Sequence, residues 1–157
     1  MIQVAAGLGH ALALQKDGRV WGWGANTYGQ ATVPTDLPPI QSVAAGARHS
    51  LAATRDGRVI AWGDNSQGQC RVPAALRNVV SVAAGEGHSV ALTGGGRVVV
   101  WGNNDNLQRQ VPRGLSAVTA IAAGSHHTLA LRANGTVVAW GARYNTYALP
   151  NGLWGGA

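Results

Sequence analysis

Short apolar runs with a period of two recur along the whole chain. Residues 10–14 and 58–62 alternate larger apolar side chains with small ones, which is typical of a half-buried β-strand. Residues 40–45 and 79–84 form further apolar stretches, each stopped by a glycine. No stretch has the period of an amphipathic helix. The sequence therefore predicts an all-β chain with three, or else four, short strands in each unit.

Three residue types hold the same place in every unit, and each series advances by about 39 residues. They are the glycine of Ala-Ala-Gly, a histidine three positions later and the tryptophan of a Trp-Gly pair. Their positions are Gly7, Gly46, Gly85 and Gly124; His10, His49, His88 and His127; and Trp23, Trp62, Trp101 and Trp140. A fixed period of this size is the signature of a repeat architecture. Small sheets bury both faces only when they stack radially on neighbours, so a β-propeller is expected. It would be one module over residues 1–157, with units at about 1–39, 39–76, 77–114 and 115–157.

A tight turn separates the last two runs of each unit. The pairs at this point are Asp17-Gly18, Asp56-Gly57, Gly95-Gly96 and Asn134-Gly135. Such pairs tolerate positive φ at both central positions, so the sequence predicts type I′ hairpins.

The repeated sequence Ala-Ala-Gly-x-x-His-[Ser/Thr]-Leu-Ala-Leu is followed by Asp-Gly-Arg-Val-x-x-Trp-Gly-x-Asn-x-x-Gly-Gln and a closing Val-Pro. These motifs resemble repeats of the regulator of chromosome condensation superfamily. The short period and the Val-Pro ending are most similar to bacterial members with three-stranded blades, which include the propeller-type β-lactamase inhibitory proteins. The resemblance covers the whole chain and implies the propeller fold, but a fold does not by itself assign a function. The pairs before the histidines lack the aromatic anchors of the inhibitors, and nothing resembles the wedge of the eukaryotic exchange factors.

Full members of this superfamily close a ring of about seven blades, whereas this chain has four units. Two blade faces would be left open, and rows of exposed apolar side chains are unfavourable for a soluble monomer. Two chains joined head to tail around a two-fold axis would remove both faces. We therefore expect the chain to be half of an eight-bladed ring and a homodimer. A closed four-bladed monomer and a fragment of a longer propeller are the alternatives.

Charge and cysteine content narrow the function classes. The net charge of +6 comes from basic residues that are spread along the chain without a lysine or arginine run, so nucleic acid is the weaker partner class. Cys70 is the only cysteine, which excludes an intrachain disulfide and a thiolate metal cluster. No signal peptide and no apolar run of membrane-spanning length is visible, so a cytoplasmic location is the default expectation and no membrane partner is expected.

Histidines that recur at one position in four repeats invite a metal or catalytic interpretation. Catalytic sites are usually asymmetric, whereas scaffold residues repeat with the scaffold. The imidazoles are therefore expected to satisfy backbone groups of the neighbouring blade, and the recurring tryptophans are expected in the core. The six acidic residues do not pair for acid–base chemistry, and no catalytic or phosphate-binding motif is present. The sequence predicts neither enzyme activity nor a metal or other cofactor.

Specificity is expected where the repeats differ, because repeat proteins make binding surfaces from variable loops on a rigid scaffold. Two sets of positions vary, namely the pair before each histidine and the polar loop after each Trp-Gly. The candidate partner-binding residues are Arg48, Glu86, Asp105, His126, Arg143, Tyr144 and Tyr147. The sequence thus predicts a non-catalytic scaffold that binds another macromolecule, another protein being one such partner. A self-assembling structural unit, natural or engineered, is the first alternative, and a basic nucleic-acid or chromatin binder is the second.

Overall fold

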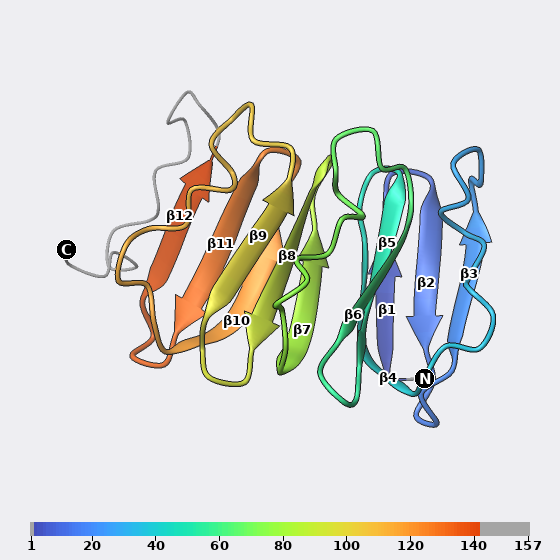
Figure 1. Cartoon of the computed structure of the whole chain (residues 1–157), viewed down its shortest axis with the longest axis horizontal. Coiled ribbons are helices and arrows are strands. Elements are labelled where there is room, and N and C mark those ends of the chain that lie inside the picture. Colours follow the sequence, from blue (N-terminus) through green and yellow to red (C-terminus); the bar gives the residue numbers. More distant parts are fainter. Residues whose placement is uncertain (1, 142–157) are drawn as a thin grey trace.

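The structure is a computed structural model that describes residues 2–141, which form four antiparallel sheets of three strands each (Figure 1). The strands are β1 Gln3–Ala6, β2 His10–Leu14, β3 Val20–Gly24, β4 Ile40–Ala45, β5 His49–Thr54, β6 Val59–Gly63, β7 Val79–Ala84, β8 His88–Thr93, β9 Val98–Gly102, β10 Val118–Ala123, β11 His127–Arg132 and β12 Val137–Gly141. The described part of the chain contains no helix long and apolar enough to cross a membrane.

Each sheet is one propeller blade, and its strand order follows the chain. Blade 1 has the order β1-β2-β3, and blades 2, 3 and 4 repeat it with β4–β6, β7–β9 and β10–β12. The first strands of successive blades contact one another, β1 with β4, β4 with β7 and β7 with β10. Figure 1 shows the blades side by side in a row, with β3 at one end and β12 at the other. The predicted all-β fold of four repeated blades, half of a propeller, is confirmed.

The hairpin between the second and third strands differs from the type I′ turn that the sequence predicts. In blade 1, Gln15 N–H donates to Arg19 C=O at 2.9 Å and Gly18 N–H donates to Gln15 C=O at 2.9 Å, so the loop has three residues. Gly18 has φ of 88°, but Asp17 is not in the left-handed region. A type I turn followed by a left-handed glycine has this geometry. Only one position in each loop therefore requires positive φ, and the residue before the glycine is free to vary.

The core consists of three apolar layers, each between two adjacent blades. Leu12 and Leu14 of blade 1 pack with Val43 and Trp62 of blade 2. Equivalent residues fill the layers between blades 2 and 3 and between blades 3 and 4. Radial stacking thus buries the sheet faces. Trp62, Trp101 and Trp140 are buried, which confirms the expected core position for these three tryptophans.

Within residues 2–141, one face of blade 1 and one face of blade 4 have no neighbouring blade. Trp23 of blade 1 is 54% exposed, whereas its counterpart Trp62 in blade 2 is 8% exposed. Leu131 of blade 4 is 39% exposed, whereas its counterpart Leu92 in blade 3 is 3% exposed. The difference arises because, among the described residues, no strand precedes β1 and none follows β12.

Candidate functional site

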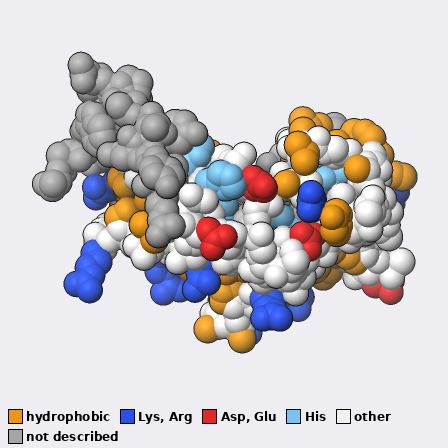
Figure 2. Space-filling model, turned by 90° about the horizontal axis from the view of Figure 1, so that it is seen from above, with side chains coloured by type: hydrophobic (Ala, Val, Ile, Leu, Met, Phe, Trp, Pro, Cys, Tyr) orange, Lys and Arg blue, Asp and Glu red, His pale blue; other side chains and the backbone are white. Residues whose placement is uncertain are grey.

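The two sets of variable loops lie at the same end of the blades. His49 at the start of β5 is in register with Gly63 at the end of β6, so the turn before the histidine and the loop after Trp-Gly are neighbours. Asp64 N–H donates to Arg48 C=O at 2.9 Å and ties the two loops together. Figure 2 shows this end of the molecule, where acidic and histidine side chains gather around a central hollow.

Four of the predicted partner-binding residues meet in one polar recess of about 290 Å³ at this end. Arg48 comes from the β4–β5 turn, Glu86 from the β7–β8 turn, His126 from the β10–β11 turn and Asp105 from the loop after β9. Three successive blades therefore contribute to one concave surface. The other three predicted residues, Arg143, Tyr144 and Tyr147, lie outside the described residues.

Two of the contacts at this polar recess join adjacent blades, and a third lies within one loop. His126 Nε2 lies 3.3 Å from Glu86 Oε2, and both side chains are about half exposed. The Arg48 guanidinium lies over the ring of Tyr28 from blade 1, 5.1 Å from the ring centroid. Asn103 donates to Asp105 Oδ2 at 3.0 Å. Because water screens such exposed pairs, their contribution to stability is small. Their side chains are instead available for contact with a partner.

The list of candidate residues omits other members of the polar recess, among them Asp64, Gln67 and Asn103, although their loops count among the variable positions. Each belongs to a polar loop after Trp-Gly, and Asn103 donates to the Gln67 side chain of the preceding blade. The signal was the equivalence of these loops in successive repeats. Loops at equivalent positions on stacked blades are neighbours, so the whole loop set could have been named as one surface.

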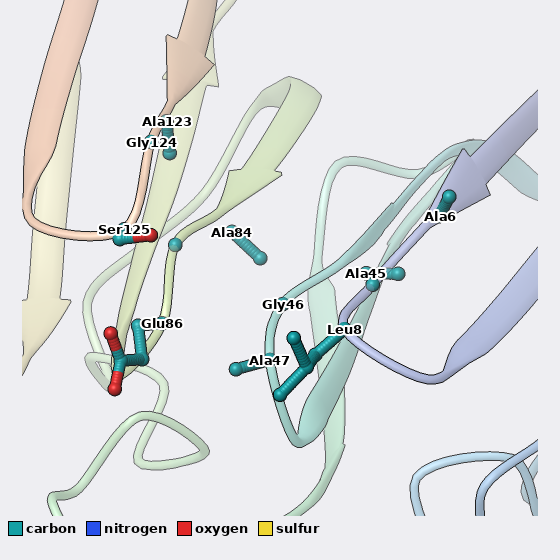
Figure 3. Close-up of a pocket in the computed structure, with 12 residues that line it drawn as sticks. Ala6, Leu8, Ala45, Gly46, Ala47, Ala84, Glu86, Ala123, Gly124 and Ser125 are labelled. Atoms are coloured by element: carbon teal, nitrogen blue, oxygen red, sulfur yellow. The ribbon is translucent and has the colours of Figure 1, made fainter.

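A second cavity, of about 420 Å³, opens between the Ala-Ala-Gly turns of all four blades (Figure 3). The residue after each glycine varies, and Leu8, Ala47, Glu86 and Ser125 line this axial cavity. Adjacent turns are hydrogen-bonded across the blades, since Ala47 N–H donates to Gly85 C=O at 3.2 Å and Glu86 N–H donates to Ser125 C=O at 3.1 Å. Glu86 lines both cavities, so the axial cavity and the polar recess adjoin one another.

The recurring histidines form a hydrogen-bonded link between blades, which we call the inter-blade latch. His10 Nε2 lies 2.9 Å from Ser50 Oγ of the next blade. Ser50 Oγ donates to Gln30 C=O at 2.8 Å, and Trp62 Nε1 donates to the same carbonyl at 3.0 Å. A serine hydroxyl has a single proton, so its donation to Gln30 makes His10 Nε2–H the donor in the first bond.

The same latch recurs at the next two blade interfaces. His49 Nε2 lies 3.0 Å from Ser89 Oγ, which donates to Gln69 C=O at 2.7 Å. His88 Nε2 lies 3.2 Å from Thr128 Oγ1. The sequence predicted backbone partners for the imidazoles in the neighbouring blade. The structure instead places a hydroxyl side chain at Nε2, and serine relays the bond to a backbone carbonyl.

Burial keeps these imidazoles neutral. It lowers the pKa of His49 and of His88 from 6.5 to about 4, and it also lowers the pKa of His10. A Cβ atom at Gly46 would lie 2.6 Å from His49 Nδ1, so the glycine of Ala-Ala-Gly makes room for the ring. Over residues 2–141, no group of three or more histidine, cysteine or acidic side chains is placed to hold a metal ion.

Comparisons with known proteins agree with this architecture. The model of the regulator of chromosome condensation (RCC1) repeat matches residues 1–30, 40–69, 79–108 and 118–148. No curated protein sequence matches the chain. Among solved structures, Prp20p from Saccharomyces cerevisiae, described for its binding to Gsp1p and histones, is 27% identical with a TM-score of 0.76, over 89% of this chain and 45% of that protein.

Two further structures extend the comparison. Human WBSCR16 is 25% identical with a TM-score of 0.72, over 88% of this chain and 47% of that one. The computationally designed Ika4 protein is 22% identical with a TM-score of 0.56, over 88% and 89%, a likeness of fold alone. The chain spans less than half the length of Prp20p and of WBSCR16. Four family matches that cover most of the chain, each on one blade, show that it belongs to the regulator of chromosome condensation (RCC1) repeat family.

Proposed function

We propose that the chain is a non-catalytic scaffold, one module over residues 1–157, that binds another protein through the polar recess and the adjoining axial cavity. The observation that carries this proposal is the convergence of Arg48, Glu86, Asp105 and His126 from three blades on one concave surface. The repeated residues of the scaffold do not dictate these side chains, and variable residues on a rigid frame are the usual basis of recognition by repeat proteins.

The chemistry of the polar recess favours a protein over a nucleic acid. Among the described residues that line it, Asp64, Glu86 and Asp105 bring three carboxylates, against the single arginine Arg48. Carboxylates repel phosphates, so the net charge of +6 does not extend to this surface. The related Prp20p binds the proteins Gsp1p and histones, which supports a protein partner for this chain as well.

The experiment compares proteins captured from a cell extract by the natural chain and by two variants. The first carries Arg48→Ala, Glu86→Ala, Asp105→Ala and His126→Ala. The matched control carries Asp17→Ala, Arg19→Ala, Asp56→Ala and Arg58→Ala. These substitutions remove two exposed ion pairs in the β2–β3 and β5–β6 hairpins, at the end of the blades that lies away from the polar recess. We expect the control to retain the captured partner and the recess variant to lose it. Equal capture by both variants would refute the assignment of this face.

Self-assembly is the second candidate function, and a separate observation favours it. Val4 is 71% exposed and Trp23 is 54% exposed on blade 1, while Leu131 is 39% exposed on blade 4. In the interior of the chain, equivalent apolar positions are buried against the next blade. A second copy joined head to tail would cover both faces at once and complete a ring of about eight blades. Sedimentation of the purified chain at several concentrations tests this, and twice the chain mass of 16.1 kDa is expected.

A further inference from the structure

In the described part of the chain, two blade faces lack a neighbouring blade, and they correspond to the two sides of the internal blade interfaces. We call the side of a blade that packs on the preceding blade its incoming face, and the side that packs on the next blade its outgoing face. On blade 1 the incoming face carries Val4, Trp21 and Trp23, which are 71%, 51% and 54% exposed. On blade 4 the outgoing face includes Leu129 and Leu131, whose counterparts Leu12 and Leu14 in blade 1 are fully buried.

The incoming face of blade 1 differs from the three internal incoming faces at two positions. The first is the hydroxyl of the inter-blade latch. In blades 2, 3 and 4 the residue directly after the recurring histidine carries a buried hydroxyl. These residues are Ser50, Ser89 and Thr128, and each hydroxyl is hydrogen-bonded to the histidine Nε2 of the preceding blade. Blade 1 has Ala11 at this position. Its side chain has no hydrogen-bonding group, so this face cannot complete a latch.

The second difference is Trp21. The equivalent residues of the other blades are Ile60, Val99 and Val138, which pack as partly buried side chains in the three internal layers. Trp21 pairs with Ala13 across the sheet, two positions before Trp23, so both indoles stand on the same incoming face. The first blade therefore has more apolar surface and less hydrogen-bonding capacity than any internal blade has on this side.

We propose that two copies of the chain close a ring through seams that differ from its internal interfaces, being apolar and lacking the latch, and that Trp21 and Ala11 set their strength. This inference rests on the self-assembly candidate above. The occupant of the incoming face of blade 1 is the outgoing face of a second copy. The chain supplies that complementary face itself, and three internal interfaces show how the two faces pack. The two faces also lie at opposite ends of the row of blades (Figure 1), as head-to-tail closure requires.

Apolar closure has a consequence for the order of disassembly. The internal interfaces combine an apolar layer with the hydrogen bonds of the latch, whereas the seam between copies has the apolar layer alone. The ring therefore opens first between copies and releases half-rings whose internal blade contacts persist. Each ring has two equivalent seams, so a single substitution acts twice.

The test measures the dimer dissociation constant by sedimentation for the natural chain and three variants. Trp21→Val introduces the residue found in blades 3 and 4 and removes apolar area from both seams, so the dissociation constant should rise at least about tenfold. Ala11→Ser supplies the hydroxyl that blades 2 and 3 carry at this position, so the dissociation constant should fall at least about threefold. Val80→Ala is the matched control, since Val80 is 41% exposed but lies on β7 of blade 3, away from both end blades. It should leave the dissociation constant within about twofold.

The outcomes separate this inference from the candidate on which it rests. A natural chain that stays monomeric at every concentration refutes self-assembly and this inference together. A dimer that Trp21→Val weakens no more than Val80→Ala refutes the seam alone, as does a dimer that Ala11→Ser leaves unchanged or loosens. Thermal unfolding at a concentration where the chain is monomeric checks that each variant folds. Positions 21 and 80 are exposed in the single chain, so these substitutions should not unfold it.

Discussion

His49 Nε2 lies 3.0 Å from Ser89 Oγ, and this contact joins two residues that are 40 positions apart in the chain and both fully buried. The serine passes the hydrogen bond on to Gln69 C=O, which Trp101 Nε1 also reaches at 2.9 Å. One imidazole, one hydroxyl and one indole thus converge at the interface between two blades. The recurring histidine and the recurring tryptophan therefore belong to one hydrogen-bonded group at the blade interface.

Removal of the hydroxyl should weaken that interface. Ser89→Ala leaves the buried Nε2–H of His49 without its acceptor, and an unsatisfied buried donor costs about 1–3 kcal/mol of unfolding free energy. Urea unfolding measures the loss. Ser66→Ala is the control, because Ser66 is an exposed loop residue, and its effect should stay within about 0.5 kcal/mol. Equal stability of the two variants would contradict the latch.

Acid should destabilise the fold through the same histidines. In the unfolded chain the imidazoles titrate at their ordinary pKa of 6.5, whereas burial lowers the pKa of His49 and His88 to about 4 in the folded chain. Between these two pH values the unfolded chain binds more protons, so the free energy of unfolding falls as the pH drops from 6.5 towards 4. Each histidine accounts for a loss of up to about 3 kcal/mol at the lower limit.

Urea unfolding between pH 7.5 and 4 measures this dependence. The variant His49→Gln should be less stable than the natural chain at neutral pH and should have a shallower decline with acid, because one of the buried imidazoles with a lowered pKa is gone. A natural chain whose stability does not change between pH 7 and pH 4.5 would show that these imidazoles are not buried in the neutral form.

Much of the fold could be predicted because each structural demand repeats four times. The strands, the blade order and the buried tryptophans follow from a period of about 39 residues and from alternation within each unit. The glycine of Ala-Ala-Gly is visible as a constant, although the reason for it, the imidazole of His49 beneath the turn at Gly46, is a contact that only the structure gives.

The remaining features depend on which residues of adjacent repeats meet. The sequence shows that Ser50, Ser89 and Thr128 follow the histidines, but the pairing of each with the histidine of the preceding unit depends on how the blades stack. The turn type was wrong for a related reason. Asp-Gly and Asn-Gly suit both a two-residue type I′ loop and a three-residue loop with one left-handed glycine, and the strand register decides between them.

The candidate site also depends on which residues of adjacent repeats meet. Variable positions could be found in the sequence, and four of them, Arg48, Glu86, Asp105 and His126, meet in the polar recess. The members that were missed, such as Asp64 and Asn103, lie in loops of neighbouring blades that converge only in the folded structure. Partner binding at any of these residues stays a prediction.

Two hairpin glycines in the left-handed region allow backbone strain to be compared with steric crowding by a neighbouring segment. Gly57 has φ of 89°, and a Cβ atom there would lie 2.9 Å from the Asn78 Cα atom in the connection to the next blade. Gly135 has φ of 84°, and no described residue lies within 4 Å of the equivalent atom. Gly135→Val should cost about 1–3 kcal/mol through backbone strain alone. Gly57→Val should cost more, because backbone must also move, and thermal unfolding of both variants would show the difference. Equal losses would mean that the neighbouring blade does not contact this turn.

Substitutions in the polar recess should leave the free energy of unfolding nearly unchanged and should weaken binding of a protein partner. His126 and Glu86 form a cross-blade pair with side chains that are 50% and 57% exposed. Exposed pairs of this kind contribute little, so Glu86→Ala and His126→Ala, alone or together, should each change the unfolding free energy by no more than about 0.5 kcal/mol. The same substitutions remove charge from a concave surface that three blades share. We therefore expect the recess variants to capture less of a protein partner while their midpoint of thermal unfolding stays unchanged. Ser89→Ala should instead lower the midpoint, and it should reduce capture only as far as it reduces the folded fraction. If the recess substitutions instead lower the midpoint as much as Ser89→Ala does, these residues belong to the scaffold, and the binding surface must be sought elsewhere on the blades.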